Sequence, residues 1–147
     1  MIARRRVLRI GGGAAAVVLA RRLPAVPDTL AGAIAAFTAG APVKAGGVRL
    51  DVAALVDNGN TVPMTVSTDE ALGRVDMVAV FNERNPERDV VRFSFGPRAS
   101  QVRASTRIRL ATSQKLVAVA RLADGTFRSD TVDVVVTLAA CIEGEGA

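Results

Sequence analysis

The segment KLVAVARLADGTFRSDTVDVVVTL, residues 115–138, decides the fold. Two apolar-rich runs, Lys115 to Leu122 and Phe127 to Leu138, flank Asp124-Gly125, and this arrangement predicts a β-hairpin with a tight turn. In the second run the apolar residues alternate with polar ones, which indicates a strand with one buried face. The chain therefore ends on a predicted antiparallel strand pair.

Short apolar runs separated by turn residues continue this pattern toward the N-terminus. Asn58-Gly59 predicts a tight reversal, Pro63 is expected at a strand start or sheet edge, and residues 52–55 are expected to form one helical turn. About seven strands without alternating helices predict an all-β, immunoglobulin-like antiparallel β-sandwich. Besides the two strands of the hairpin, strands are expected at residues 48–51, 62–67, 75–81, 90–95 and 102–110.

One short helix is expected before the first strand, over residues 28–40. Asp28 or Thr29 is suited to the N-cap, and Gly40 is suited to end the helix. The spacing of its apolar residues favours packing on the sheet over packing on a partner. These apolar residues are Leu30, Ile34 and Phe37.

The N-terminus predicts export from the cytoplasm. Arg4 and Arg5 begin a pattern of paired arginines, spacer, apolar pair and base that is typical of the twin-arginine route. The apolar run that follows, residues 10–20, is short for a membrane span, so we expect a cleaved signal over residues 1–25. A basic amphipathic N-terminus that stays in the cytoplasm is the alternative. The expected location is periplasmic, without membrane contact after cleavage.

The basic character of the chain belongs largely to this signal. The 147 residues carry 19 Lys and Arg against 14 Asp and Glu, but six of the bases precede residue 26 and all of the acids follow it. The remainder therefore has a net charge of about −1, and the high pI does not indicate a nucleic-acid partner. Arg103, Arg107 and Arg109 form a stripe that could attract anions, although a solvated strand face or a subunit interface is the favoured interpretation.

The only cysteine, Cys141, lies just beyond the last predicted strand. An exported protein with one cysteine has no intramolecular disulfide, so the thiol is reactive, carries an adduct or pairs with another chain. A small buried hydrophobic residue is the alternative interpretation.

The chain has no histidine. We therefore expect no metal site and no cofactor, and the missing general base argues against a hydrolase.

Four stretches of the sequence together resemble SoxY, the thiosulfate-carrier subunit of the periplasmic sulfur-oxidation system. The resemblance covers roughly residues 28–138 and implies a carrier that is not itself an enzyme. The stretches are NGNTVP at 58–63, FNERNP at 81–86, STRIRLA at 105–111, and VAVA at 117–120 followed by DG at 124–125.

The resemblance implies a role for each part of the chain. Residues 26–138 would form the SoxY-like domain, and residues 139–147 a flexible C-terminal arm with Cys141 as the covalent attachment point. A haem c-type enzyme would couple thiosulfate to this sulfur as a cysteine S-thiosulfonate, and a hydrolase would then release sulfate. The carrier would work as a heterodimer with a SoxZ-like subunit.

The arm departs from the glycine-rich pattern of the family. Ala139 and Ala140 stand where glycines would be, which predicts a stiffer arm. Ile142 adds bulk and Glu143 adds negative charge, with Gly144 following. The altered arm motivates a second hypothesis, a non-carrying structural or interaction paralogue that pairs with a SoxZ-like subunit. A third hypothesis, a thiol-dependent sulfurtransferase, is disfavoured by the absence of histidine.

Overall fold

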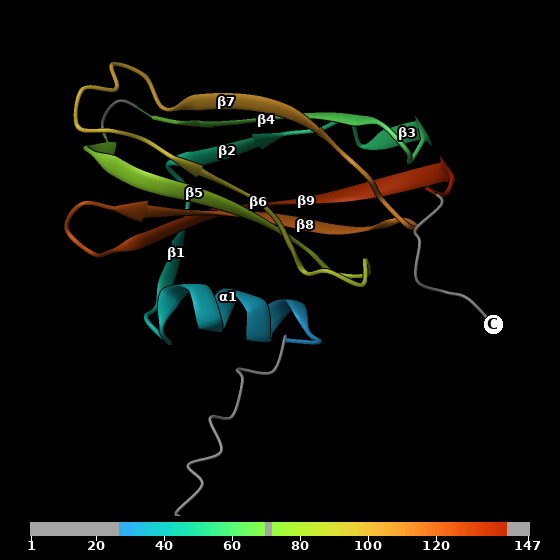
Figure 1. Cartoon of the computed structure of the whole chain (residues 1–147), viewed down its shortest axis with the longest axis horizontal. Helices are drawn as coiled ribbons and strands as arrows, with labels where there is room; N and C mark the ends of the chain where they lie inside the picture. The colour runs from blue at the N-terminus through green and yellow to red at the C-terminus, as the bar shows by residue number, and fades with distance from the viewer. Residues whose placement is uncertain (1–26, 70–71, 141–147) are drawn as a thin grey trace, which may run out of the picture.

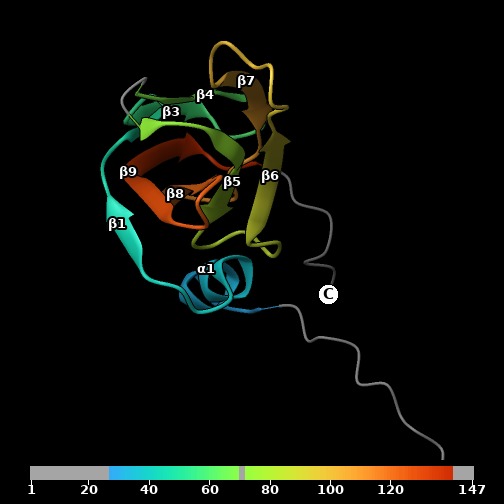
Figure 2. The same ribbon diagram turned by 90° about the vertical axis from the view of Figure 1, so that its left-hand side faces the viewer.

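The chain folds into two β-sheets packed face to face, with one helix against the outer face of the larger sheet (Figures 1 and 2). The computed structural model describes residues 27–69 and 72–140. The predicted sandwich with an N-terminal helix is confirmed, and its immunoglobulin-like character stays a prediction. In this part of the chain the elements are α1 (Leu30–Thr38), β1 (Val43–Ala45), β2 (Val48–Asp51), β3 (Leu55–Asn58), β4 (Val62–Thr68), β5 (Val75–Asn82), β6 (Asp89–Ser94), β7 (Arg103–Ile108), β8 (Gln114–Leu122) and β9 (Phe127–Leu138).

The β8–β9 hairpin has the turn that the sequence predicts. Gly125 has a φ of 84°, the left-handed conformation that glycine adopts without strain. The hydroxyl and the amide of Thr126 donate to Asp124 Oδ1 at 2.7 and 2.9 Å. Both bonds lower the pKa of the Asp124 carboxyl, the hydroxyl bond most strongly. The hairpin prediction is therefore confirmed.

The larger sheet has the strand order β1-β9-β8-β5-β6, and β3 also pairs with β9. β8 pairs with one edge of β9, and β1 and β3 both pair with its other edge. Both run parallel to β9. β1 pairs with the beginning of β9 and β3 pairs with its end. The predicted antiparallel sandwich therefore has two additional short strands, β1 and β3, that pair in parallel. β1 has only three residues and β3 begins with two adjacent apolar residues, so neither shows the alternating pattern that predicts the four-residue strand β2.

The sequence of β3 also corrects a local prediction. Residues 52–55 do not form a helical turn, and Leu55 begins β3. Leu55 lies opposite Val135 in parallel register, so backbone pairing with β9 overrides the weak helical tendency of this stretch.

The smaller sheet has the order β2-β4-β7 and is antiparallel throughout. Pro63 is the second residue of β4, where only β7 pairs with it, because the register with β2 starts at Thr65. Its predicted place at a strand start is confirmed. The two sheets enclose an apolar core, whose fully buried members include Val62, Met64, Val66, Val78, Val80, Leu110, Leu116 and Ala118.

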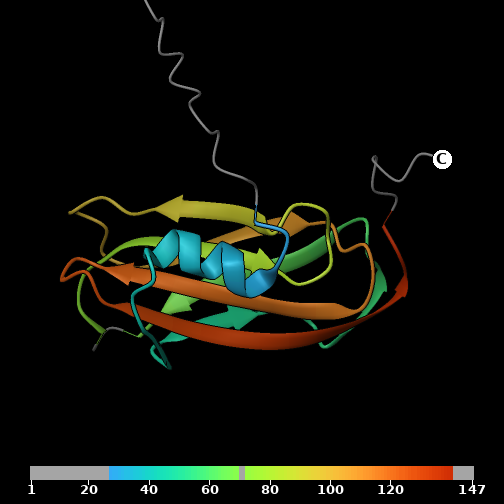
Figure 3. The same ribbon diagram turned by 90° about the horizontal axis from the view of Figure 1, so that it is seen from below.

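The helix packs on the outer face of the larger sheet (Figure 3). Thr29 caps its N-terminus by accepting a hydrogen bond from the Gly32 amide at 3.0 Å. The ring of Phe37 meets the rings of Phe81 and Phe127 edge-on, with centroids 5.7 and 5.9 Å apart. This second apolar cluster confirms that the helix packs on the sheet.

The helix ends at Thr38, two residues before the glycine that was expected to end it. Ala39 takes the left-handed conformation with a φ of 51°, and Gly40 follows with a φ of 79°. A side chain with a Cβ is strained in this region, which glycine tolerates.

We expect Ala39→Gly to raise the free energy of unfolding by about 0.5–1 kcal/mol, because it removes the left-handed strain at a small entropic cost. Ala35→Gly is the matched control in the helix body and should lower stability by about 1 kcal/mol. Urea unfolding followed by circular dichroism measures both. A loss of stability in Ala39→Gly would contradict the assigned helix end.

Candidate functional site

The candidate site is the end of the described chain, where the predicted C-terminal arm would begin. Ala139 and Ala140 belong to the described part of the chain. The other predicted site residues lie outside the described residues. These are Cys141, Ile142, Glu143 and Gly144 in the arm and Arg4 and Arg5 in the export signal.

Ala140 is anchored to the body of the protein. Its amide donates to the carbonyl of Leu110 at 3.0 Å, and only 9% of the residue is exposed. Ala139 is exposed. The residue directly before Cys141 is therefore held by the loop that follows β7.

Gly59 allows three backbone segments to approach one another closely. This approach makes the hydrogen bond between Ala140 and Leu110 possible. Its amide donates to Leu138 O at 2.7 Å, and its carbonyl accepts from Leu110 N at 2.8 Å. A Cβ at this buried position would lie 2.4 Å from Leu110 O and 3.0 Å from Ala140 N. The sequence predicts a glycine here for a turn, but the structure shows that the missing side chain also lets the end of β9 reach Leu110.

Asn85 holds the loop that carries Leu110. Its side-chain amide donates to Arg109 O at 2.8 Å, and its Oδ1 accepts from Ala111 N at 3.0 Å. The same oxygen also accepts a hydrogen bond from Gln114 Nε2 at 2.7 Å. Asn85 is buried, with only 8% of the residue exposed. The residues on both sides of Leu110 are thus bonded to one buried side chain, which positions the anchor of the arm.

Asn82 in turn positions Asn85. Asn82 Oδ1 accepts from the Asn85 amide at 2.9 Å, and its Nδ2 donates to Glu87 O at 2.6 Å. Asn82 is almost fully buried. The FNERNP stretch therefore supports the loop that bonds Ala140, a role that the sequence did not reveal because asparagines in a charged loop are usually exposed.

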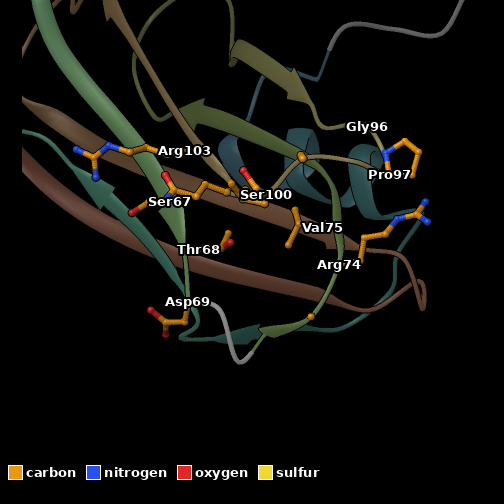
Figure 4. A pocket seen from close by; sticks show the side chains of 13 residues that line it. Ser67, Thr68, Asp69, Arg74, Val75, Gly96, Pro97, Ser100 and Arg103 are labelled. Atoms are coloured by element: carbon orange, nitrogen blue, oxygen red, sulfur yellow. The ribbon is translucent and has the colours of Figure 1, made fainter.

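The arginines at positions 103, 107 and 109 are all exposed, as expected of a solvated strand face. Arg103 also borders a hollow of about 540 Å³ between the β4–β5 and β6–β7 connections (Figure 4). The β4–β5 and β6–β7 connections lie at the end of the sandwich opposite to the end of β9 (Figure 1). Arg103 and Arg74 point away from each other in Figure 4, and Arg74 pairs with Asp76, so the hollow offers no converging cations.

Two further properties concern residues 27–69 and 72–140. In this part of the chain, no three His, Cys, Asp or Glu side chains are grouped so that they could hold a metal ion. The helix found there is also too short to pass through a lipid bilayer.

Several solved structures have a similar fold. The sulfur carrier protein SoxY from Chlorobium limicola f thiosulfatophilum is 28% identical with a TM-score of 0.64, covering 75% of this chain and 97% of its own. A superoxide reductase (neelaredoxin) variant from Ignicoccus hospitalis is 15% identical, with a TM-score of 0.54 and coverage of 62% and 80%. A putative superoxide reductase from Thermotoga maritima is 14% identical, with a TM-score of 0.52 and coverage of 68% and 89%. The likeness to the reductases concerns the fold alone.

A comparison with curated proteins found no match. The family described as "Sulfur oxidation protein SoxY" matches residues 34–141, which is most of the chain and extends to Cys141. This match confirms the resemblance seen in the sequence. The chain therefore belongs to the SoxY family of sulfur-oxidation proteins.

Proposed function

We propose that this protein is a periplasmic carrier of sulfur compounds that holds thiosulfate-derived groups covalently on Cys141. Its family and its similarity to a sulfur carrier protein support a carrier rather than an enzyme. The observation that carries the proposal is the anchored residue before the thiol. Ala140 is fixed to Leu110 at the rim of the sandwich, and Cys141 is the next residue and the last one of the family match.

The loading step joins two sulfur atoms and removes two electrons. The Cys141 thiolate and the outer sulfur of thiosulfate form an S–S bond, which gives a cysteine S-thiosulfonate. Both electrons pass to the haem c-type enzyme. The chain contains no histidine that could act as a base. In this proposal the partner supplies the oxidant, and this protein presents the thiol.

The release step is a hydrolysis by a second partner. Water attacks the terminal sulfonate sulfur, sulfate leaves with two protons released, and a persulfide stays on Cys141. A SoxZ-like subunit completes the carrier as a heterodimer in this proposal. Export by the twin-arginine route, through Arg4 and Arg5, would bring the protein to the periplasm where these partners act.

The hydrogen bond of Ala140 limits where the proposed arm can begin. Ala140 donates its amide to Leu110, so an arm that reaches into a partner enzyme would begin at residue 141 or would first break this bond. Breaking this hydrogen bond between two buried residues costs about 1–3 kcal/mol, which binding to an enzyme can offset. The hydrogen bond between Ala140 and Leu110 is equally compatible with the alternative function, a non-carrying paralogue that binds a SoxZ-like subunit.

Purified protein incubated with thiosulfate and the haem c-type coupling enzyme should gain the mass of one S₂O₃ group, removable by reductant. Cys141→Ser should gain none, because a hydroxyl does not form the S–S bond. Intact mass spectrometry with peptide mapping measures the adduct. A wild-type protein that binds a SoxZ-like subunit but never gains this mass would establish the non-carrying alternative.

Gly59→Ala should lower the free energy of unfolding by about 2–3 kcal/mol, because its Cβ would displace the Leu110 carbonyl or the end of β9. Amide hydrogen exchange at Ala140 should become faster at the same time. Gly96→Ala is the matched control, since a Cβ there meets no atom within 4 Å. Unchanged exchange at Ala140 in Gly59→Ala would argue against the proposed anchor.

A further inference from the structure

One side of the sandwich is bordered by two strands that have no further neighbour among the described residues. β7 is the last strand of the smaller sheet, and β6 is the last strand of the larger sheet. Figure 2 shows both strands on the same side of the molecule. At the opposite edges β2 lies close to β9, whereas the backbones of β6 and β7 hardly approach each other. The described part of the chain therefore leaves the β6–β7 side of the sandwich open.

The backbone of β7 presents hydrogen-bonding groups to this open side. The Thr68 amide donates to Val102 O at 3.1 Å just before β7, and the pairing of β4 with β7 continues from there without a shift. Hydrogen-bonded pairs alternate in an antiparallel ladder, so every second residue of β7 bonds to β4, beginning with Ala104. The residues between them point their amide and carbonyl groups to the open side. These residues are Arg103, Ser105 and Arg107.

Apolar side chains near the two edges are incompletely covered. Val91 and Phe93 on β6 and Ala104 on β7 pack against the apolar core, but all three are only partly buried. An additional strand beside β7 would bond to the open backbone groups and cover these side chains. The inner face of such a strand is therefore expected to be apolar.

The outer face of β7 carries two positive charges without acidic partners. Arg103 and Arg107 are exposed, and their neighbours across the ladder, Ser67 and Pro63, are uncharged. Asp51 lies on β2 and is separated from β7 by β4. Neither guanidinium group takes part in an ion pair among the described residues. The open edge of β7 is therefore basic on its outer face.

These charges argue against a second copy of the chain as the additional strand. Antiparallel pairing of two β7 strands around Ser105 would place Arg103 of each copy opposite Arg107 of the other. Like charges directly opposite each other destabilise a strand pair. The same arginines favour a strand with Asp or Glu at two positions four residues apart. β6 is a less selective edge, because its Arg92 is already paired with Asp89.

We propose that the open edge of β7 binds a strand of another protein chain, with acidic residues on its outer face and apolar residues on its inner face. The acidic residues lie opposite Arg103 and Arg107, and the apolar residues cover the partly buried side chains of β6 and β7. We assign this strand to the SoxZ-like subunit, so the inference rests on the proposed function. A permanent subunit fits better than a transient enzyme, because permanent interfaces resemble a protein core cut in two.

The first test is amide hydrogen exchange, measured by NMR spectroscopy on the protein alone and in complex with the SoxZ-like subunit. We expect the amides of Arg103, Ser105 and Arg107 to exchange at least about tenfold more slowly in the complex, because they donate to the added strand. The exposed amide of Asp124, in the β8–β9 turn, is the control and should not change. Unchanged exchange at all three β7 amides in a formed complex would overturn the inference.

The second test blocks the edge with Ser105→Pro. Proline removes an amide that faces the open side and leaves the bonds between β7 and β4 in place. We expect the Kd for the SoxZ-like subunit to rise about 100-fold in isothermal titration calorimetry. Ser105→Ala is the matched control, because it also loses the hydroxyl contact with Thr65 at 2.8 Å but keeps the amide. Circular dichroism shows whether each variant is folded, and an unchanged Kd in folded Ser105→Pro would contradict the proposed strand addition.

The third test reverses one charge with Arg107→Glu. We expect the Kd to rise about tenfold at low salt and less at high salt, because the charge repels the acidic residues of the partner strand. Arg49→Glu is the matched control, since Arg49 is exposed on the far strand of the same sheet. This variant keeps the backbone unchanged, so it decides the matter if Ser105→Pro does not fold. Equal Kd values for Arg107→Glu and the wild type would then refute the proposed interface.

The outcomes separate this inference from the carrier function. Wild-type protein that gains the S₂O₃ mass and binds the SoxZ-like subunit with unprotected β7 amides would overturn the inference and leave the carrier function intact. Protected β7 amides in a protein that is never loaded would refute the carrier function and leave the interface intact. A dimer of the free protein that Ser105→Pro disrupts, seen by light scattering, would assign the edge to a second copy and overturn the inference. Wild-type protein that binds no SoxZ-like subunit would refute that partner and the inference with it.

Discussion

A close approach of backbone segments at Gly59 is the constraint on which the arm depends. Three backbone hydrogen bonds connect Leu138 to Gly59, Gly59 to Leu110, and Leu110 to Ala140. They join the end of the last strand to the loops after β3 and β7, and so they tie both sheets together at one rim. A side chain at position 59 would occupy the place of the Leu110 carbonyl, so the arrangement requires glycine.

Buried asparagines support this rim from inside. Asn85 satisfies the backbone on both sides of Leu110, and Asn82 fixes Asn85. Buried amides hold a loop in one conformation because losing any one bond leaves an unsatisfied polar group in the interior. The charged loop after β5 thereby supports Ala140, a residue far away in the sequence and close to the C-terminus.

In the proposed carrier, the sandwich is the rigid part and the cysteine is the reactive part. The sandwich and its bonded rim set where the chain leaves the body, and the single cysteine follows directly. The exposed side chains of Leu55 on β3 and Val135 on β9 lie side by side, and β9 is the last described strand before the cysteine. In the proposed function, partner enzymes supply the chemistry, and this protein supplies the thiol.

The sequence by itself determined the hairpin at Asp124-Gly125, most of the strands and the helix, because turn residues and apolar alternation are local signals. It also singled out Cys141, and its short family stretches led to the SoxY resemblance. Only the tertiary structure decided the parallel strands β1 and β3, the buried roles of Asn82 and Asn85, and the anchoring of Ala140. These features depend on contacts between residues far apart in the chain, and such contacts leave no periodic pattern in the sequence.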